Sequence, residues 1–167
     1  MEGQYRLRSG RGSIPGEKAI SFLDPAAIDG ARVRSHMAPG AQLIRVRPGS
    51  IERMTIDTWI DGSRALIRNG TLPTFWEGEI ARRIDRLGDI AHVFSTYEAR
   101  PRRDDPRVLW RGINSVQLYR RGGRWWVSSI LWTRESEETR IPPEYLPGEL
   151  PRSRAIAGRG RARARRR

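Results

Sequence analysis

The fold is decided by two stretches of sequence, IDRLGDIAHVFSTY at residues 84–97 and VQLYRRGGRWWV at residues 116–127. In each stretch, apolar and polar side chains alternate on both sides of a short glycine-containing turn, which is the pattern of an antiparallel β-hairpin. Glycine favours such turns because it adopts positive φ without a steric penalty. The region from Trp76 to Trp132 is therefore predicted to form a strongly twisted antiparallel sheet of two long hairpins.

The turns also predict which residues pair across the strands. A tight turn at residues 87–90 pairs residue 84 with 93 and residue 80 with 97. A turn at Gly122-Gly123 pairs residue 118 with 127, 116 with 129 and 114 with 131. In this register the second hairpin has one dry face and one partly apolar face that carries Gln117, Trp126 and Trp132. Such a face suits a partner subunit, a helix or a ligand better than water, and it is the predicted dimer face.

Helical signals precede the hairpins. Apolar residues recur at helical spacing after Thr55, a favoured N-cap, and Asn69-Gly70 is a natural end for that helix. A short strand is predicted at Gln42–Arg47, followed by a turn at Pro48-Gly49. Helical segments followed by a run of strands indicate the α+β class. The expected organisation is a poorly defined helical or irregular segment at 1–36, a domain at 37–147 and a disordered arginine-rich tail at 148–167.

Charge and composition limit the classes of function. The 167 residues carry a net charge of +13, and the eight arginines between Pro151 and Arg167 account for most of it. This tail either contacts nucleic acid or an acidic partner through phosphate-like charges, or is an uninvolved extension. The chain has no cysteine, which excludes disulfides and thiolate metal sites. It also has no apolar run as long as a membrane span and no signal-peptide stretch, so a cytoplasmic protein without membrane contact is expected.

Several segments together resemble a known family. Residues 88–98, 111–118 and 122–132, with the strap IPPEYL at 141–146, resemble the nuclear transport factor 2-like superfamily, and most closely its bacterial SnoaL-like members of unassigned function. The resemblance covers about Gln42 to Leu146. It implies a cone-shaped α+β barrel, in which a curved, mainly antiparallel sheet wraps around a hydrophobic pocket beneath N-terminal helices. It also implies homodimers formed through the sheet. The long first helix of the superfamily is not evident in residues 1–36, so either that helix is degenerate or the pocket is less covered.

Candidate pocket residues follow from the predicted faces. The polar side chains on the more apolar faces of the hairpins belong to Ser95, Tyr97, Asn114 and Ser129. A pocket for an apolar or amphipathic molecule needs a few such groups to orient its ligand. The alternative, which we favour, is that the asparagine and the serines bond to neighbouring backbone and fill space.

A second candidate is a polar pair. His92 is predicted to lie opposite Asp85 across the first hairpin, where the two could act as a base and its orienting group. An exposed ion pair of little energetic weight is the favoured interpretation, since the same face carries further charges. The sequence shows no metal-ligand spacing and no phosphate-binding glycine loop, so no metal and no cofactor are predicted.

Two functions from different classes remain open at this point. The first is a small-molecule-binding cone protein of unknown specificity; the resemblance extends this to an isomerase, cyclase or hydratase-type enzyme. The second is a non-catalytic homodimeric interaction module whose arginine-rich tail binds nucleic acid or an acidic partner.

Overall fold

The computed structural model describes residues 29–71 and 74–148, and over these ranges the chain forms a six-stranded sheet with two α-helices. The elements are α1 (Gly30–His36), β1 (Met37–Arg47), β2 (Ser50–Met54), α2 (Ile56–Arg68), β3 (Trp76–Leu87), β4 (Ile90–Arg100), β5 (Trp110–Arg121), β6 (Arg124–Arg134) and the 3-10 turn η2 (Pro143–Tyr145). Predictions for residues 1–28 and 149–167, including the arginine-rich tail, lie outside the described residues.

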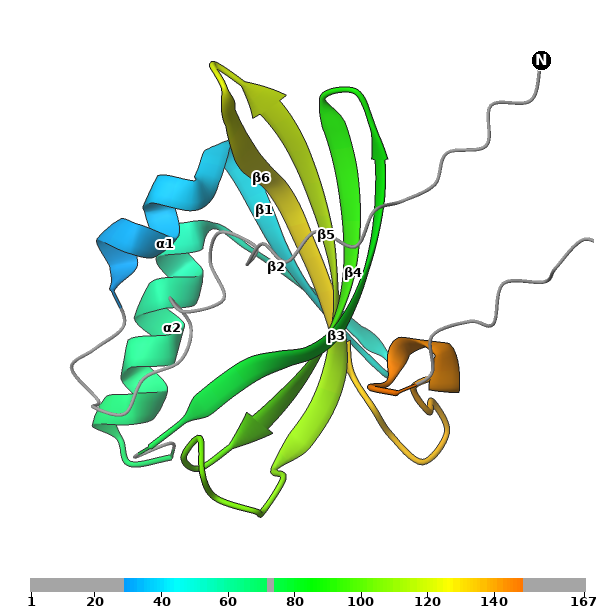
Figure 1. Cartoon of the computed structure of the whole chain (residues 1–167). Coiled ribbons are helices and arrows are strands. Elements are labelled where there is room, and N and C mark those ends of the chain that lie inside the picture. Colours follow the sequence, from blue (N-terminus) through cyan, green and yellow to red (C-terminus); the bar gives the residue numbers. More distant parts are fainter. Residues whose placement is uncertain (1–28, 72–73, 149–167) are drawn as a thin grey trace, which may run out of the picture.

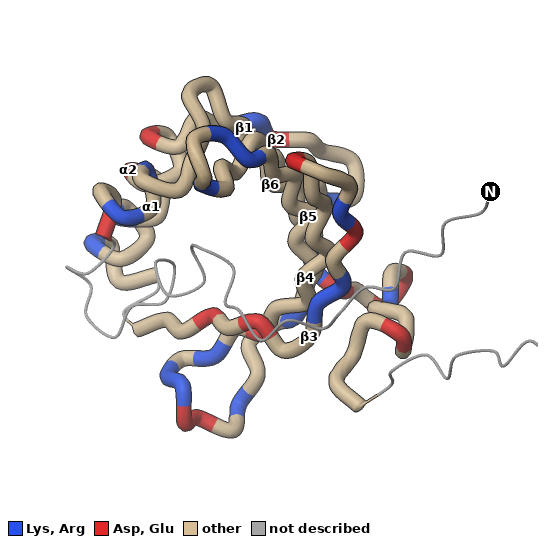
Figure 2. The backbone as a smooth tube through the Cα atoms, turned by 45° about the horizontal axis from the view of Figure 1, so that its top comes forward, with Lys and Arg blue, Asp and Glu red and all other residues tan. Residues whose placement is uncertain are grey.

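The sheet is curved and mainly antiparallel. Its strand order is β2-β1-β6-β5-β4-β3, and of its five pairings that between β1 and β6 is parallel. The helices lie on the concave side of this sheet (Figure 1). In the tilted view, the strands form an arc and α1 and α2 stand across its open side (Figure 2). This α+β cone confirms the predicted fold class.

Extra residues in two strands change the predicted register. The pairs 84–93, 85–92 and 118–127 are confirmed, but β3 has a bulge between Glu79 and Ala81, so Glu79 rather than residue 80 faces Tyr97. A second bulge in β6 shifts the remaining pairs to 116–130 and 114–132. The predicted pairs 80–97, 116–129 and 114–131 are therefore wrong. Because side chains alternate with period two, one extra residue moves every later side chain to the other face.

Helix α2 is fixed to the concave face by its apolar side. Thr55 begins the helix, as predicted, by accepting a hydrogen bond from the backbone N–H of Thr58 at 3.2 Å. Ile60 and Ile67 are buried against Phe75 and Ala99, the latter on β4. These contacts hold the helix over the β3 and β4 end of the cone.

A second apolar cluster forms the floor of the cone. Val93 of β4, Val116 and Leu118 of β5 and Val127 of β6 are buried together on the concave face. Met37 at the start of β1 packs against them. The floor and the α2 cluster are separate, and the polar residues of the concave face lie between them.

The predicted strap at 141–146 contacts the convex face. Thr96 of β4 donates a hydrogen bond to the carbonyl oxygen of Tyr145 at 2.6 Å, and the rings of Phe94 and Tyr145 meet edge to face at 4.9 Å. Next to them, burial opposes ionisation of Glu98, but hydrogen bonds from Arg111 and Arg100 outweigh it and hold the pKa of this carboxyl below its usual value. Part of the convex face is thus already covered by the chain itself.

Replacing Ile60 with alanine tests the anchoring of α2. Ile60 has no exposed surface, so Ile60→Ala leaves a cavity and is expected to lower the free energy of unfolding by about 2–5 kcal/mol. Urea denaturation measures this value. The control is Leu66→Ala on the same helix, whose side chain is 39 % exposed and should change stability by less than about 1 kcal/mol. Equal losses in both variants would contradict this account of the packing.

Candidate functional site

Cross-strand pairing arranges the concave face in rows. One row crosses four strands and contains Glu79, Tyr97, Gly112 and Arg134. The next row contains Arg82, Ser95, Asn114 and Trp132, with Arg45 of β1 beside the tryptophan. Directly paired residues in a sheet point to the same face, so these two rows present their side chains to the interior of the cone.

Gly112 makes the first row possible. A Cβ at this position would lie 2.5 Å from the phenol oxygen of Tyr97 and would also collide with the carbonyl of Thr133. Without that Cβ, the Tyr97 ring reaches over β5 and accepts a hydrogen bond from Arg134 on β6. The Arg134 guanidinium also stacks over the Trp110 ring, 3.7 Å from its centroid. One arginine therefore connects a buried phenol with an aromatic wall.

Glu77 lies beside this row, opposite Ala99 on β4. Burial raises the pKa of Glu77 to about 7, and the positive charge of Arg134 opposes the shift. Burial and the nearby Glu77 charge also raise the pKa of Tyr97, although Arg134 and Arg45 counteract this. At neutral pH the Glu77 carboxyl is thus divided between its neutral and ionised forms, while Tyr97 stays protonated.

The second row contains both satisfied and available polar groups. Ser95 donates a hydrogen bond to Glu79 Oε2 at 2.6 Å, and Glu79 also forms an ion pair with Arg82. The Asn114 amide, in contrast, has no hydrogen-bond partner among the described residues and keeps accessible surface. A half-buried primary amide in this state can donate to and accept from a bound molecule.

Arg45 and Trp132 complete the second row at the β1 side. The Arg45 guanidinium lies 5.3 Å from the Trp132 ring centroid and pairs with Glu52 at 3.1 Å. Burial is the largest effect on Arg45 and lowers its pKa. Trp132 and its neighbour Ile130 remain only half-buried, so the helices do not cover this part of the concave face completely.

The structure brings together three of the four predicted pocket residues. Ser95, Tyr97 and Asn114 lie in adjacent rows of the concave face. Ser129 pairs with Gln117 on the convex face, because the β6 bulge reverses its direction. Ser129 is thus separated from the other three, and a ligand-binding role for those three stays a prediction.

Glu77 and Arg134 were missed by sequence reasoning. Both lie at the ends of strands, and the pairing predicted from the two turns does not extend to these positions. The alternation of Glu77 and Glu79 around Gly78 was the available signal, since residues two apart on a strand share a face.

His92 and Asp85 are cross-strand partners on the convex face, as their register predicted. His92 Nε2 forms its hydrogen bond with Ser115 Oγ at 2.9 Å, and Asp85 lies 3.8 Å from Arg83. The pair therefore lies outside the concave site, and its ring is oriented by a serine rather than by the carboxylate.

The predicted dimer face is divided by the β6 bulge. Gln117 and Trp126 lie on the convex face, whereas Trp132 pairs with Asn114 on the concave face. The three residues do not form one surface. Dimer formation itself stays a prediction.

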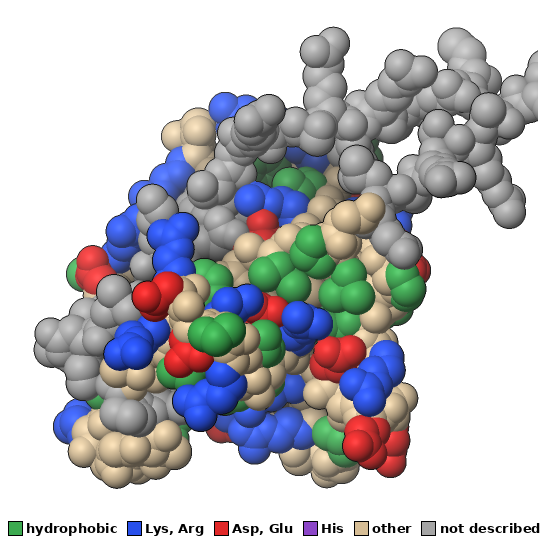
Figure 3. All heavy atoms as spheres, turned by 60° about the horizontal axis from the view of Figure 1, so that its bottom comes forward, with side chains coloured by type: hydrophobic (Ala, Val, Ile, Leu, Met, Phe, Trp, Pro, Cys, Tyr) green, Lys and Arg blue, Asp and Glu red, His purple; other side chains and the backbone are tan. Residues whose placement is uncertain are grey.

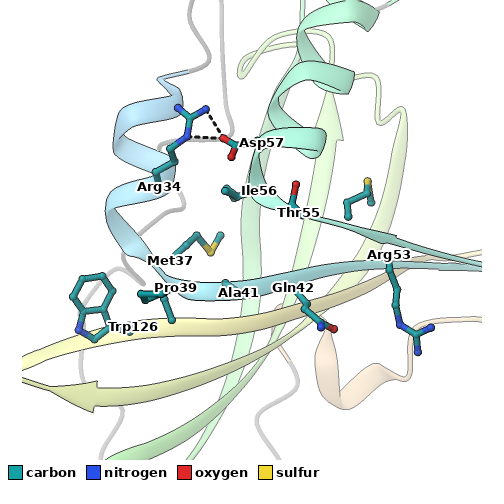
Figure 4. Close-up of a pocket in the computed structure, with 13 residues that line it drawn as sticks. Arg34, Met37, Pro39, Ala41, Gln42, Arg53, Thr55, Ile56, Asp57 and Trp126 are labelled. Atoms are coloured by element: carbon teal, nitrogen blue, oxygen red, sulfur yellow. Dashed lines mark hydrogen bonds and ion pairs between the residues drawn. The ribbon is translucent and has the colours of Figure 1, made fainter.

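A separate groove of about 640 Å³ lies at the start of β1 (Figure 4). It runs along residues 37–42 of β1, which β2 does not pair, between α1 and the first turn of α2. An ion pair between Arg34 and Asp57, at 2.6 Å, spans its upper side. Its walls are mostly apolar, and the predicted pocket residues do not line it.

The described residues hold no group of three or more His, Cys, Asp or Glu side chains suited to a metal ion. Within the same ranges, no helix is both long and apolar enough to cross a membrane.

Comparison with known proteins identifies the fold. No family model matches the sequence, and no curated protein matches it. Solved structures do match. A protein of unknown function with a cystatin-like fold from Nostoc punctiforme is 15 % identical, with 74 % of this chain and 85 % of that chain covered and a TM-score of 0.55. A protein from Kribbella flavida is 14 % identical, with coverage of 72 % and 85 % and a TM-score of 0.51.

The description of a third matching structure names the fold. An NTF2-like protein of unknown function from Pseudomonas putida is 14 % identical, with 68 % of this chain and 80 % of that chain covered and a TM-score of 0.50. At such identities the likeness concerns the fold, and the chain has the NTF2-like fold that the resemblance of its sequence implied.

Adding a methyl group at Gly112 tests the first row. Gly112→Ala is expected to lower the free energy of unfolding by about 1–3 kcal/mol, because the new Cβ displaces Tyr97 or the β6 backbone. Chemical denaturation measures the loss. The matched control is Gly62→Ala in α2, where a Cβ meets open space and should stabilise the helix by up to about 1 kcal/mol. A neutral Gly112→Ala variant would contradict the crossing of Tyr97 over β5.

The raised pKa of Glu77 predicts a pH-dependent stability. Between pH 4.5 and about 7 the folded chain holds a proton on Glu77 that the unfolded chain has released. The free energy of unfolding therefore falls as pH rises through this window, by at most about 3 kcal/mol from this group. Glu77→Gln should lack this component. In urea denaturation at several pH values, the free energy of unfolding of the variant should therefore rise relative to that of the native chain as the pH increases to 7. The control Glu138→Gln, at an exposed position without an ion pair among the described residues, should track the native chain, and parallel profiles for Glu77→Gln would contradict the assignment.

Proposed function

We propose that this chain binds a small amphipathic molecule on the concave face of its sheet. The apolar body of the ligand packs against Ile130 and Trp132, the half-buried apolar side chains at the edge of the floor. Its polar end lies against the rows that carry Tyr97, Asn114 and Arg134. The proposal rests chiefly on the Asn114 amide, which is half-buried and has no partner among the described residues, beside an incompletely covered apolar surface.

The polar end has a defined chemical preference. The Arg134 guanidinium and the Asn114 amide both donate hydrogen bonds, and both suit a carbonyl or carboxylate oxygen. The Glu77 carboxyl, with its pKa near 7, can take or give a proton at neutral pH. The ligand class is therefore an apolar molecule with an oxygen-bearing head. If the chain is an enzyme, proton transfer of the isomerase or hydratase type is the chemistry these groups support.

A ligand screen with paired variants tests the proposal. The purified chain is titrated with aromatic ketones, medium-chain carboxylates and matching hydrocarbons, and binding is followed by thermal shift and calorimetry. We expect the oxygen-bearing compounds to bind and the hydrocarbons to bind more weakly. Asn114→Leu should weaken binding about five- to tenfold, the worth of one hydrogen bond.

The control is Gln117→Leu, which makes a similar change three residues along the same strand but on the convex face. This variant should bind as the native chain does. Absence of binding by every compound, or an equal loss in both variants, would count against the concave site.

A further inference from the structure

The ends of the two hairpins form a surface that the concave site does not use. Leu87, Ile90, Tyr119 and Trp126 pair in succession across β3, β4, β5 and β6, so their side chains form one row on the convex side. At the usual strand spacing this row is about 15 Å long. Leu87 and Ile90 are each 62 % exposed. The row lies at the upper end of the sheet in Figure 1, where both hairpins turn.

Arginines surround this row and are held in place. The Arg124 guanidinium lies 4.2 Å from the Trp126 ring centroid, and the Arg86 guanidinium lies 4.9 Å from that of Trp125. Arg86 also donates to the carbonyl of Gly88 at 3.0 Å. Arg120 and Arg121 stand beside the second turn. Arg121 and Arg124 pair with each other and lie on the same face as the row, whereas Arg86 and Arg120 belong to rows of the opposite face. We call the four row residues with Arg121 and Arg124 the hairpin-tip surface.

The two turns act as one unit. The backbone N–H of Arg120, in the second hairpin, donates to the carbonyl of Asp89 in the first turn at 2.8 Å. Because this bond ties the turns together, the exposed aliphatic pair and the arginines keep their relative positions. The hairpin-tip surface is therefore a preformed feature of the sheet.

The charge of this surface is strongly positive. Residues 83–90 and 119–126 together contain five arginines and two aspartates. One aspartate, Asp85, is near Arg83 at 3.8 Å, whereas Arg120, Arg121 and Arg124 have no carboxylate partner in the described part of the chain. The positive field reaches α1, because after burial the charges of Arg124 and Arg32 are what lower the pKa of His36.

The opposite end of the molecule differs. There, basic and acidic side chains are interspersed (Figure 3), and Glu98 pairs with both Arg100 and Arg111. The end of the molecule opposite the hairpin tips thus pairs part of its arginines with carboxylates.

We propose that the hairpin-tip surface docks on an anionic lipid bilayer. Leu87 and Ile90 enter the interfacial region, Tyr119 and Trp126 lie at the depth of the headgroups, and the arginines pair with lipid phosphates and anionic headgroups. Aliphatic insertion and electrostatic attraction are the two contributions that together give stable peripheral binding. Aromatic side chains with one apolar and one polar end favour this depth.

Single-stranded nucleic acid fits the same surface less well. Bases bind by stacking on free aromatic faces, but arginines already cover one face each of Trp125 and Trp126. Two protruding aliphatic side chains offer a polynucleotide neither a stacking face nor a hydrogen bond. They do offer a bilayer apolar surface.

Vesicle sedimentation of the full chain tests the proposal. The vesicles contain either phosphatidylcholine alone or equal parts of phosphatidylcholine and phosphatidylglycerol. We expect binding to the mixed vesicles only, and we expect it to weaken as salt screens the electrostatic contribution. The double variant Leu87→Ser, Ile90→Ser should weaken this binding about tenfold or more, because both side chains lose their transfer to the interface.

Two matched controls separate this surface from general basicity. Ile51→Ser changes an equally exposed aliphatic residue (65 %) at the β1–β2 turn and should leave vesicle binding unchanged. Arg121→Glu with Arg124→Glu should weaken binding to the mixed vesicles at physiological salt at least as much as the Leu87/Ile90 double variant does. Arg102→Glu with Arg103→Glu, in the loop between β4 and β5, should reduce binding only slightly.

Three outcomes overturn the proposal. The first is equal losses in the Leu87/Ile90 and Ile51 variants, and the second is an absence of binding to either vesicle. The third is binding to a single-stranded oligonucleotide that depends on Arg121 and Arg124, while the aliphatic pair has no effect on vesicle binding. That last result would assign the surface to nucleic acid.

Discussion

The extra residue in β6, Ser128, is the constraint on which the rest of the structure depends. It turns Ile130 and Trp132 toward the interior of the cone and places Arg134, which stays exposed, on the same face at the end of the strand. With regular alternation these side chains would lie on the convex face, and Tyr97 would lose the arginine that bonds to it. The bulge also bends the strand, which is how an antiparallel sheet acquires the curvature of a cone. Shape and chemistry of the concave face therefore have a common origin.

The interior of the cone has separate apolar and polar regions. An apolar floor occupies the part of the cone toward the hairpin turns, α2 covers the other end, and the polar rows lie between them. Arg134 connects the polar residues because it reaches Tyr97, Trp110 and the field of Glu77 at once. In a medium of low dielectric such an arrangement has two effects: it keeps a carboxyl near its titration point and a phenol protonated. A ligand that brought its own oxygen atom would enter an electrostatic environment that is already ordered.

The sequence predicted those parts of the structure that local rules govern. Thr55 as the start of α2, the glycine turns and the pairs next to them all depend on neighbouring residues, and they were correct. Ser129 and Trp132 were placed on the wrong faces, because a bulge leaves no mark in an alternating pattern. Glu77 and Arg134 were missed since their proximity depends on pairing across four strands. The hairpin-tip surface was not predicted for a similar reason: its apolar residues come from separate strands and never form a continuous stretch of the sequence.

The parallel pairing of β1 with β6 has a consequence for the order of folding. Leu43 pairs with Ile130, so β1 can pair only after β6, about 90 residues later in the sequence, has been synthesised. Both hairpins can form from contacts close in sequence, whereas β1 and β2 gain their place only when β6 is available. During synthesis, β1 with its following hairpin would therefore leave the ribosome before its partner exists. An apolar strand without its neighbour is prone to wrong association, so slow or arrested translation before residue 134 is where this chain would be most vulnerable.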